Sequence, residues 1–408
     1  MLYSGVFTNT PYRNFWLGST FSYVGDAMTG VALVWLVYAS TGSPPAVGLL
    51  LVCYTAPVVV GGLVAGSLLD GFDRRKVMIG DNCVRGAAVA SIPLLFVLGL
   101  FALWEVYLVA LVYGFFYMIT LAGAPTIVPD LLEEDQLTAA NSLETITFTL
   151  SGVIGPPLAG LVILGFGAQN VMIVDAVSYL ALVAALASFR LPRMATDSKT
   201  RSRTTIMDAF RLLASNRILL STTLMFMSFN VGEGVLALWL PILSNTILSG
   251  GPELYGLLLG AMAVGQLAGA SVAERLSTRW SVGKLIITAQ TLSGVSLVLI
   301  LMSLGTWLVA TALVLLGFLS APLTAWAQTL RMRIIPAELR GRTFALLRTF
   351  MQAASPTGSG LAGIVFPTTG LLPLVGLSAI LIGGPGLAGS QVKQLSRARL
   401  DAIDADND

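Results

Sequence analysis

The chain has 408 residues, of which 55% are hydrophobic and only 11% are charged, and its formal net charge is +2. Soluble domains carry about 25% charged residues, so a protein this poor in charge would expose apolar patches to water and aggregate. Most of its surface must therefore face lipid. No basic stripe is interleaved with aromatic residues, which argues against a nucleic-acid partner. Histidine is absent, which excludes His-based metal sites, and we expect neither a metal nor a cofactor.

Twelve runs of the sequence are apolar and long enough to cross a membrane. A helix needs about 20 residues to span a hydrocarbon core of about 30 Å. In chain order, the predicted transmembrane helices cover residues 14–38, 46–69, 77–101, 104–126, 139–164, 168–190, 216–244, 253–273, 282–304, 306–330, 342–366 and 369–389. The last of them is short, and we expect it to be broken at Gly383, Gly384, Pro385 and Gly386.

The basic residues predict the orientation of these helices. With both termini in the cytoplasm, all 23 Lys and Arg residues fall on the cytoplasmic side, including those from Arg331 to Arg342. Arg85 and Arg348 would lie in the cytoplasmic third of a helix and extend toward water. No Lys or Arg remains for an external loop, which is a strong positive-inside pattern. We therefore expect a multi-pass protein of the plasma (inner) membrane with both termini cytoplasmic.

The longest polar stretch, residues 190–205, lies at the midpoint of the chain. It divides the sequence into four parts. These are an N-terminal six-helix bundle (residues 1–189), a cytoplasmic linker with an interfacial helix (190–214), a C-terminal six-helix bundle (215–389) and a cytoplasmic tail (390–408). Within the linker, Thr205 and Asp208 have the spacing of a capping box. Ile206, Phe210 and Leu213 share one face of the helix that would follow.

Three short patterns recur at an offset of about half the chain. The repeated pairs are Gly66–Arg75 with Ala270–Arg279, Leu158–Val162 with Leu361–Val365, and Val24-Gly25-Asp26 with Val231-Gly232-Glu233. Parallel six-helix repeats, with a substrate site between the halves near mid-membrane, are an architecture of secondary transporters.

Acidic residues in the middle of predicted membrane helices need a reason, because a charge at mid-bilayer costs about 2.5–3.5 kcal/mol on insertion scales. Asp26 and Glu233 lie near the centres of the first and seventh helices at matched positions, and Asn230 lies nearly one turn before Glu233. We expect these residues to face a central cavity as protonatable groups or as anchors for a cationic substrate. A structural acid bonded to a neighbouring helix is the alternative. Asp175 lies nearer the external end of the sixth helix, where packing and cavity roles fit equally well.

The loop between the second and third helices reads Gly66-Ser-Leu-Leu-Asp70-Gly71-Phe72-Asp73-Arg74-Arg75-Lys76. It resembles the loop signature of the major facilitator superfamily, G-x-x-x-D-R-x-G-R-R. Two positions depart from that signature. Gly71 stands where the signature has a basic residue, and Asp73 stands where the signature has a glycine. The variant with Asp before the paired arginines resembles the drug and siderophore exporters, which include the enterobactin exporter and macrolide efflux proteins. The fourth helix lacks the arginine that many proton-driven members carry there.

The resemblance implies a gating motif at the inner face, formed by Gly66, Asp70, Asp73, Arg74 and Arg75. The gating role itself is implied for Asp70 and Arg75. Together with Arg74, these two residues could join an ion-pair network with Asp81, Arg85, Glu144 and the acidic run 133–135. For the residues other than Asp70 and Arg75, a solvated charge is the alternative.

The fifth helix carries Gly152, Gly155, Pro156 and Gly160, a pattern similar to the glycine–proline signature of superfamily antiporters. Small residues let helices approach closely, and proline removes a backbone hydrogen bond and bends a helix. The resemblance implies a helix that bends as the two halves rock. Ordinary small-residue packing is the alternative.

The predicted fold class is an all-α polytopic membrane protein with twelve transmembrane helices in two six-helix pseudo-symmetric bundles, the major facilitator fold. We expect a monomeric secondary active transporter, a proton-coupled exporter of small organic amphiphiles (drug- or siderophore-like) that works by alternating access. Its partners would be membrane lipid, a small-molecule substrate and protons, with no nucleic acid. A lipid or lysophospholipid translocator of the same fold and a non-transporting receptor or scaffold are the alternatives. The sequence shows no P-loop and no nucleophile–base pattern, so we expect neither an ATP-driven pump nor an enzyme.

Overall fold

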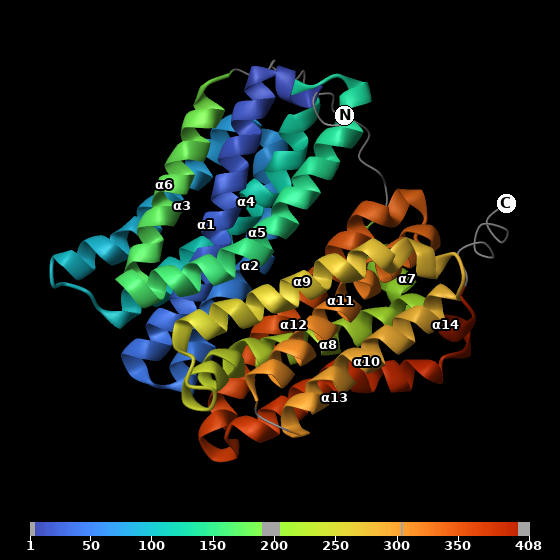
Figure 1. Ribbon diagram of the computed structural model, residues 1–408. Coiled ribbons are helices and arrows are strands. Elements are labelled where there is room, and N and C mark those ends of the chain that lie inside the picture. Colours follow the sequence, from blue (N-terminus) through green and yellow to red (C-terminus); the bar gives the residue numbers. More distant parts are fainter. Residues whose placement is uncertain (1–4, 190–204, 303–304, 399–408) are drawn as a thin grey trace. The chain divides into compact units, whose positions relative to one another are not determined.

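The computed structural model describes residues 5–189, 205–302 and 305–398, and these residues are mostly helical (Figure 1). The predicted linker residues 190–204 and the tail residues 399–408 lie outside this description. The α-helices are α1 (Thr10–Thr41), α2 (Pro44–Gly71), α3 (Arg74–Val97), α4 (Leu103–Leu131), α5 (Leu137–Phe166), α6 (Ala168–Ala187), α7 (Ile206–Ser215), α8 (Arg217–Thr246), α9 (Gly251–Ser277), α10 (Val282–Met302), α11 (Thr306–Ile334), α12 (Arg340–Thr369), α13 (Leu371–Ser390) and α14 (Lys393–Arg397). Short 3₁₀ helices cover Val6–Thr8, Glu134–Gln136 and Ala337–Leu339.

Each predicted transmembrane run corresponds to one long helix, in α1–α6 and α8–α13. Among the described residues, 10 helices are long and apolar enough to cross a membrane by length and composition. The two long helices outside that group, α3 and α12, begin with the basic residues Arg74 and Arg340 and carry further charges. They nevertheless pack with their apolar neighbours, α3 against α4 and α6, and α12 against α8. Both helices are therefore part of the helix bundle despite their charges.

The predicted break in the last transmembrane helix is wrong, because α13 continues through Gly383–Gly386 to Ser390. Gly383 and Gly386 lie against α10. A Cβ at Gly383 would stand 2.8 Å from Gly294 Cα, and a Cβ at Gly386 would stand 2.3 Å from Thr291 Oγ1. The small residues thus allow two helices to approach closely instead of ending one of them.

The predicted capping box at the start of α7 is confirmed. Thr205 Oγ1 accepts the Asp208 N–H, and the Asp208 carboxylate accepts the Thr205 N–H at 2.8 Å. Hydrogen bonds from the Thr205 backbone and side chain lower the pKa of Asp208. Leu213 is buried with residues of α8 and α12, whereas Phe210 is 48% exposed, and the interfacial orientation of this face stays a prediction. The side chain of Ile206 lies outside the described set.

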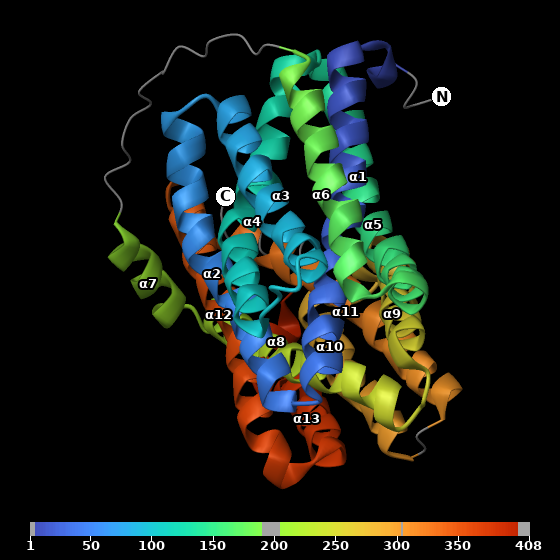
Figure 2. The same ribbon diagram turned by 90° about the vertical axis from the view of Figure 1, so that its left-hand side faces the viewer.

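The described helices form two compact units. The first contains α1–α6 and the start of α9 (Gly250–Gly260), and the second contains α7, α8, the rest of α9 and α10–α14. In the first unit α1 packs against α5 and α6, as Figure 2 shows, and α3 packs against α4 and α6. In the second unit α8 packs against α12 and α13, and α10 against α11 and α13. The same set of pairings therefore recurs in each unit.

The repeated Val-Gly-acid pattern has a packing function in both units. A Cβ at Gly25 of α1 would stand 2.4 Å from Asp175 Oδ1 on α6. A Cβ at Gly232 of α8 would stand 2.6 Å from Ile382 Cγ1 on α13. Each glycine thus lets its helix approach the last long helix of its unit, α6 or α13. The acidic residue that follows the glycine, Asp26 or Glu233, lies one position further round the glycine's own helix.

Candidate functional site

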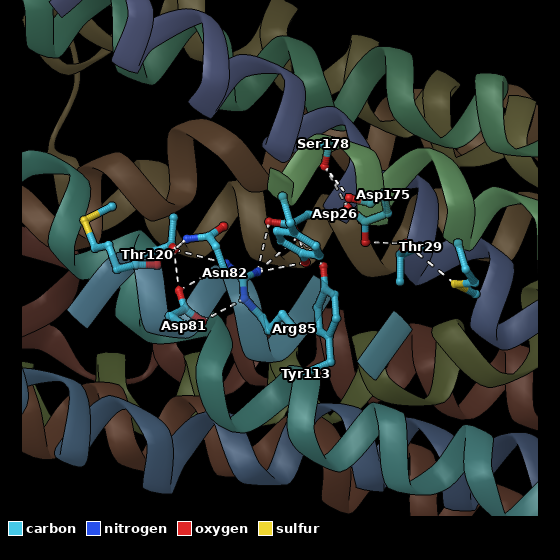
Figure 3. Close-up of polar contacts among 12 residues, drawn as sticks. Asp26, Thr29, Asp81, Asn82, Arg85, Tyr113, Thr120, Asp175 and Ser178 are labelled. Atoms are coloured by element: carbon cyan, nitrogen blue, oxygen red, sulfur yellow. Dashed lines mark hydrogen bonds and ion pairs between the residues drawn. The ribbon is translucent and has the colours of Figure 1, made fainter. Parts of the chain in front are cut away.

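A buried ion-pair cluster lies inside the first unit, centred on Arg85 of α3 (Figure 3). The Arg85 side chain is fully buried, and its Nη1 lies 3.2 Å from Asp26 Oδ1 on α1. Its Nε lies 2.9 Å from Asp81 Oδ1, and its Nη2 donates to Asp81 Oδ2 at 3.2 Å. One guanidinium is therefore shared by two carboxylates, one on its own helix and one on α1.

Two tyrosines complete the surroundings of Asp26. The Tyr113 hydroxyl donates to Asp26 Oδ1 at 2.7 Å, and the Tyr179 hydroxyl donates to the same oxygen. Tyr179 also accepts a hydrogen bond from Arg85 Nη1 at 3.0 Å. The guanidinium carbon lies 4.5 Å from the Tyr179 ring centroid and 5.7 Å from that of Tyr113, within the range of cation–π attraction. Helices α1, α3, α4 and α6 thus converge on one charged group.

Thr120 of α4 forms the corresponding contact with Asp81. Its hydroxyl donates to Asp81 Oδ2 and accepts from Arg85 Nη2 at 3.0 Å. Asn82 Nδ2 also donates to Thr120 Oγ1, again at 3.0 Å. These neutral groups stabilise both ions, because buried charges are tolerated only when they are paired and hydrogen-bonded.

Asp175 of α6 is a third buried carboxylate and lies one turn before Tyr179. It accepts hydrogen bonds from Thr29 Oγ1 at 2.6 Å and from Ser178 Oγ at 3.1 Å. Among the described residues it forms no ion pair. Together with Asp26 and Asp81 it sets three carboxylates against the single guanidinium of Arg85, which leaves a formal charge of −2 when all are ionised. Uptake of a proton by this group of residues would reduce its uncompensated charge.

The prediction that Arg85 extends toward water is wrong, since its side chain is completely buried. The physical reason is that α3 packs against both α4 and α6, so the face that carries Asp81 and Arg85 has no access to solvent. The i, i+4 spacing of these two residues in an apolar run was a usable signal of their pairing. No comparable signal marked Tyr113, Tyr179 or Thr120, because isolated hydroxyl groups are common in membrane helices.

In the second unit, the predicted pair Asn230 and Glu233 separates into two roles. Asn230 Nδ2 donates to the Met351 carbonyl of α12 at 2.8 Å, which uses this amide for helix packing. Glu233 is half-buried on α8, and within the described part of the chain its carboxylate has no hydrogen bond or ion pair. Glu233 is thus an acidic side chain in the middle of α8 without a partner among the described residues.

Arg331 lies in the last turn of α11, the end that the sequence assigns to the cytoplasmic side, and its side chain is only 3% exposed. Its Nη2 donates to the Thr222 carbonyl of α8 at 3.0 Å, and its guanidinium lies 4.7 Å from the Phe226 ring centroid. Nη1 lies 3.6 Å from Met351 Sδ on α12. In the described residues no carboxylate pairs with it. The second unit therefore holds a buried cation, as the first does, but without acidic partners.

The residues of the predicted gating motif join helix ends within the first unit. Asp73 caps α3 by accepting the Lys76 N–H, and Arg74 Nη1 donates to the Thr126 carbonyl of α4 at 3.2 Å. Arg75 donates to the Leu186 and Ala187 carbonyls at the end of α6, at 2.5 and 3.1 Å. A cation at a helix C-terminus is stabilised by the partial negative charge of the free carbonyls.

Other members of the predicted inner-face network lie elsewhere or remain outside the description. Gly66 is exposed on α2, and the side chain of Asp70 is not among those described. Glu144 accepts a hydrogen bond from the Tyr23 hydroxyl at 2.6 Å, and Asp81 pairs with Arg85 inside the bundle. Glu144, Asp81 and Arg85 are therefore not part of the predicted surface network.

The glycine–proline pattern lies in α5, which stays continuous from Leu137 to Phe166. Gly155 is the position of closest approach to α1, because a Cβ there would stand 2.6 Å from the Ala27 Cβ. Pro156 and Gly160 are buried, whereas Gly152 is half-buried and a Cβ at that position would meet no atom within 4 Å. A packing role for Gly155 is therefore evident.

Comparison with known proteins supports the same architecture. A family model described as "Transmembrane secretion effector" matches residues 4–407. The multidrug efflux pump Tap of Mycolicibacterium fortuitum is 26% identical, over 89% of this chain and 93% of that protein. The enterobactin exporter EntS of Citrobacter koseri is 25% identical, over 87% of this chain and 85% of that protein. The solved structure of a mutant of the nucleoside transporter NupG superposes with a TM-score of 0.76 at 14% identity, over 94% of this chain and 98% of that chain.

These matches confirm the predicted fold class and the resemblance to the exporter branch. The matched region covers nearly the whole chain, and the solved structure that shares its fold is that of a transporter. The chain belongs to the transmembrane secretion effector family, a group of multi-pass major facilitator transporters that function in efflux and secretion.

Proposed function

We propose that this transporter is a proton-coupled exporter of small organic amphiphiles, and that Asp26 and Asp175 are its proton-binding carboxylates. The observation that carries the proposal is the sharing of the fully buried Arg85 side chain between Asp26 and Asp81. Paired charges at this depth are costly to bury and are commonly functional. The names of two relatives, a multidrug efflux pump and an enterobactin exporter, favour an organic substrate and outward transport.

In the proposed cycle, protonation of Asp26 weakens its attraction to Arg85. The guanidinium then pairs with Asp81 alone, and the ionic contact between α1 and α3 is lost. Tyr113 and Tyr179 stay within hydrogen-bonding distance of the neutral carboxyl group. Release of the proton restores the contact, so the proton occupancy of Asp26 biases the packing of α1. A coupling free energy of about 1–3 kcal/mol is typical of such linked equilibria.

Other residues have supporting roles in this proposal. Glu233 binds the cationic part of a substrate, since its carboxylate has no partner among the described residues. Asp70 and Arg75 control closure of the inner face, and α5 bends at Pro156 as the halves at residues 1–189 and 215–389 rock. The protein acts as a monomer in the plasma membrane with both termini in the cytoplasm.

The test is uphill transport in proteoliposomes with an imposed pH gradient, screened over dyes, macrolides, siderophores and lysolipids. Asp26→Asn should abolish pH-driven accumulation while sparing membrane insertion, because the variant mimics a permanently protonated group. Glu105→Gln is the matched control: Glu105 is 8% exposed against 9% for Asp26, lies in the same unit and does not contact Arg85. Full accumulation by Asp26→Asn would make its carboxylate structural. Transport confined to lysolipids would identify a lipid translocator instead.

A second variant separates substrate binding from coupling. Glu233→Gln should weaken binding of cationic substrates and leave neutral ones unaffected. If it instead abolishes pH-driven transport of all substrates, Glu233 belongs to the proton pathway.

A further inference from the structure

A groove runs between α8 and α13 in the second unit. Its polar end is a pocket of about 540 Å³ lined by Arg217, Ser221, Gln391, Lys393 and Gln394 among others. Its apolar end is a pocket of about 500 Å³ lined chiefly by Leu224, Met225, Ile380, Leu381 and Gly384. The two pockets share Ser221, Leu224 and Val392, so they form one continuous groove.

The polar end has the chemistry of an anion site. Arg217 and Lys393 are both exposed, and neither forms an ion pair with any described residue. Gln391, Gln394 and Ser221 add neutral hydrogen-bond donors and acceptors, and no acidic side chain lines this pocket in the part of the chain that is described. Two cations with adjacent amide and hydroxyl groups suit a phosphodiester with a polar substituent.

The groove as a whole, from its polar end to its apolar end, has the depth of one membrane leaflet. From Arg217 to Ser228 the axis of α8 rises about 16 Å, at about 1.5 Å per residue. Half of a hydrocarbon core of about 30 Å is about 15 Å. Leu224 is 55% exposed and Ile380 is 68% exposed, so apolar surface faces outward along the groove. Gly384 carries no side chain, and only Ile380 Cγ2, at 3.8 Å, would lie near a Cβ there.

We propose that this groove binds one anionic glycerophospholipid from the surrounding membrane, with its phosphate between Arg217 and Lys393 and an acyl chain along Leu224, Ile380 and Gly384. A free anion would use only the polar end, and a zwitterionic lipid would place its own cation beside the two basic side chains. Basic pockets between membrane helices at an interface are a recognised setting for anionic lipid headgroups. Such a lipid connects the start of α8 to the segment that follows α13, and it thereby stabilises the packing of these two helices.

The test is lipid binding to the purified full-length protein, measured by native mass spectrometry with phosphatidylglycerol and with phosphatidylcholine of the same acyl chains. Arg217→Gln/Lys393→Gln should weaken phosphatidylglycerol binding roughly 30-fold, since each basic residue near an anionic lipid contributes about a fivefold factor. Arg275→Gln/Arg279→Gln is the matched control: it removes the same charge from exposed positions of this unit that do not line the groove. Equal losses in the two double variants would overturn the proposal.

The apolar end is tested separately by filling it. Gly384→Leu should reduce phosphatidylglycerol binding without changing the charge of the protein. Gly376→Leu on the same helix is its control, because its Cβ would also stand 3.8 Å from a single side-chain atom and lies outside the groove. Displacement of the lipid by an equal concentration of glycerol 3-phosphate would show that only the headgroup is held, and would overturn the acyl-chain site. Should the charge double variant fail to fold, each single variant should show about a fivefold loss.

Discussion

Arg85 on α3 lies 3.2 Å from Asp26 on α1, and the guanidinium is completely buried. The same guanidinium holds Asp81, four residues earlier on its own helix, at 2.9 Å. Because Asp81 stays next to Arg85 whatever α1 does, the Asp26–Arg85 contact is the one that motion or protonation can break. The two carboxylates are therefore not equivalent, although both touch the same cation.

This asymmetry predicts the order of stability of two variants. Arg85→Gln leaves both acids buried without a cation, and breaking a buried pair in this way costs about 3–5 kcal/mol. Asp26→Asn leaves the Arg85–Asp81 pair intact and keeps an amide that the tyrosines can still contact, so its cost should be much smaller. Thermal unfolding of both variants in the same detergent measures the difference.

Arg85→Lys provides the control for charge alone. A lysine ammonium retains the positive charge but cannot donate to both carboxylates and Thr120 with the fixed fork of a guanidinium. Its stability should fall between those of the wild type and Arg85→Gln. An Asp26→Asn variant as unstable as Arg85→Gln would show that Asp81 alone does not satisfy the guanidinium.

A second prediction concerns the contact between α1 and α6. Gly25→Ala should destabilise the first unit and impair transport, because the new Cβ would stand 2.4 Å from Asp175 Oδ1 and 2.6 Å from Ser178 Oγ. Gly30→Ala on the same helix should be neutral, since its Cβ would lie 3.6 Å from the Tyr54 hydroxyl. Overpacking of this kind costs about 1–3 kcal/mol. Equal unfolding temperatures for the two variants would contradict the close approach.

The sequence was sufficient to locate the helices but not the faces they bury. Long apolar runs predicted each transmembrane helix, because a membrane-spanning helix must satisfy its backbone groups internally. Rotation of a helix about its axis has no comparably simple sequence signal. The sequence therefore predicts that Arg85 extends toward water, whereas packing by α4 and α6 buries it. It likewise gives no sign that Arg331, in the last turn of α11, is buried against α8 and α12.

The candidate site shows the same limit. Asp26 stood out because an acid in an apolar run is rare, and Asp175 could be found in the same way. Their partners come from other helices: Tyr113 of α4 and Tyr179 of α6 for Asp26, and Thr29 of α1 for Asp175. Contacts between helices far apart in the sequence depend on three-dimensional packing, which a single sequence does not specify.

The third prediction concerns orientation. In a variant without Cys53 and Cys83, single cysteines at Asn245 or Thr369 should react with impermeant thiol reagents added outside the cell. Cysteines at Thr278 or Gln391, at the opposite ends of the helices, should react only after the membrane is permeabilised. All four positions are exposed, so a difference in labelling reports the side of the membrane. Labelling of Gln391→Cys from outside would reverse the orientation inferred from the positive-inside rule.

The last prediction concerns Arg331, a buried cation without an acidic partner in the described residues. Its contacts are the Thr222 carbonyl, the Phe226 ring and Met351 Sδ, which only partly replace the hydration of a charge. Arg331→Met removes the charge and retains an apolar side chain of similar reach, so its unfolding temperature should equal or exceed that of the wild type. Arg331→Lys keeps the charge but loses the planar group that stacks on Phe226, and it should be less stable than Arg331→Met.

The transport activities of these two variants should follow the opposite order to their stabilities. If Arg331 served only to hold helices together, an apolar side chain could replace it at a lower energetic cost. We therefore infer that the positive charge of Arg331 itself has a use. We therefore expect Arg331→Lys to retain part of the transport activity and Arg331→Met to lose it, at equal amounts of protein in proteoliposomes. If Arg331→Met were less stable than Arg331→Lys, the charge would be stabilising where it lies, and if Arg331→Met transported normally, Arg331 would serve packing alone.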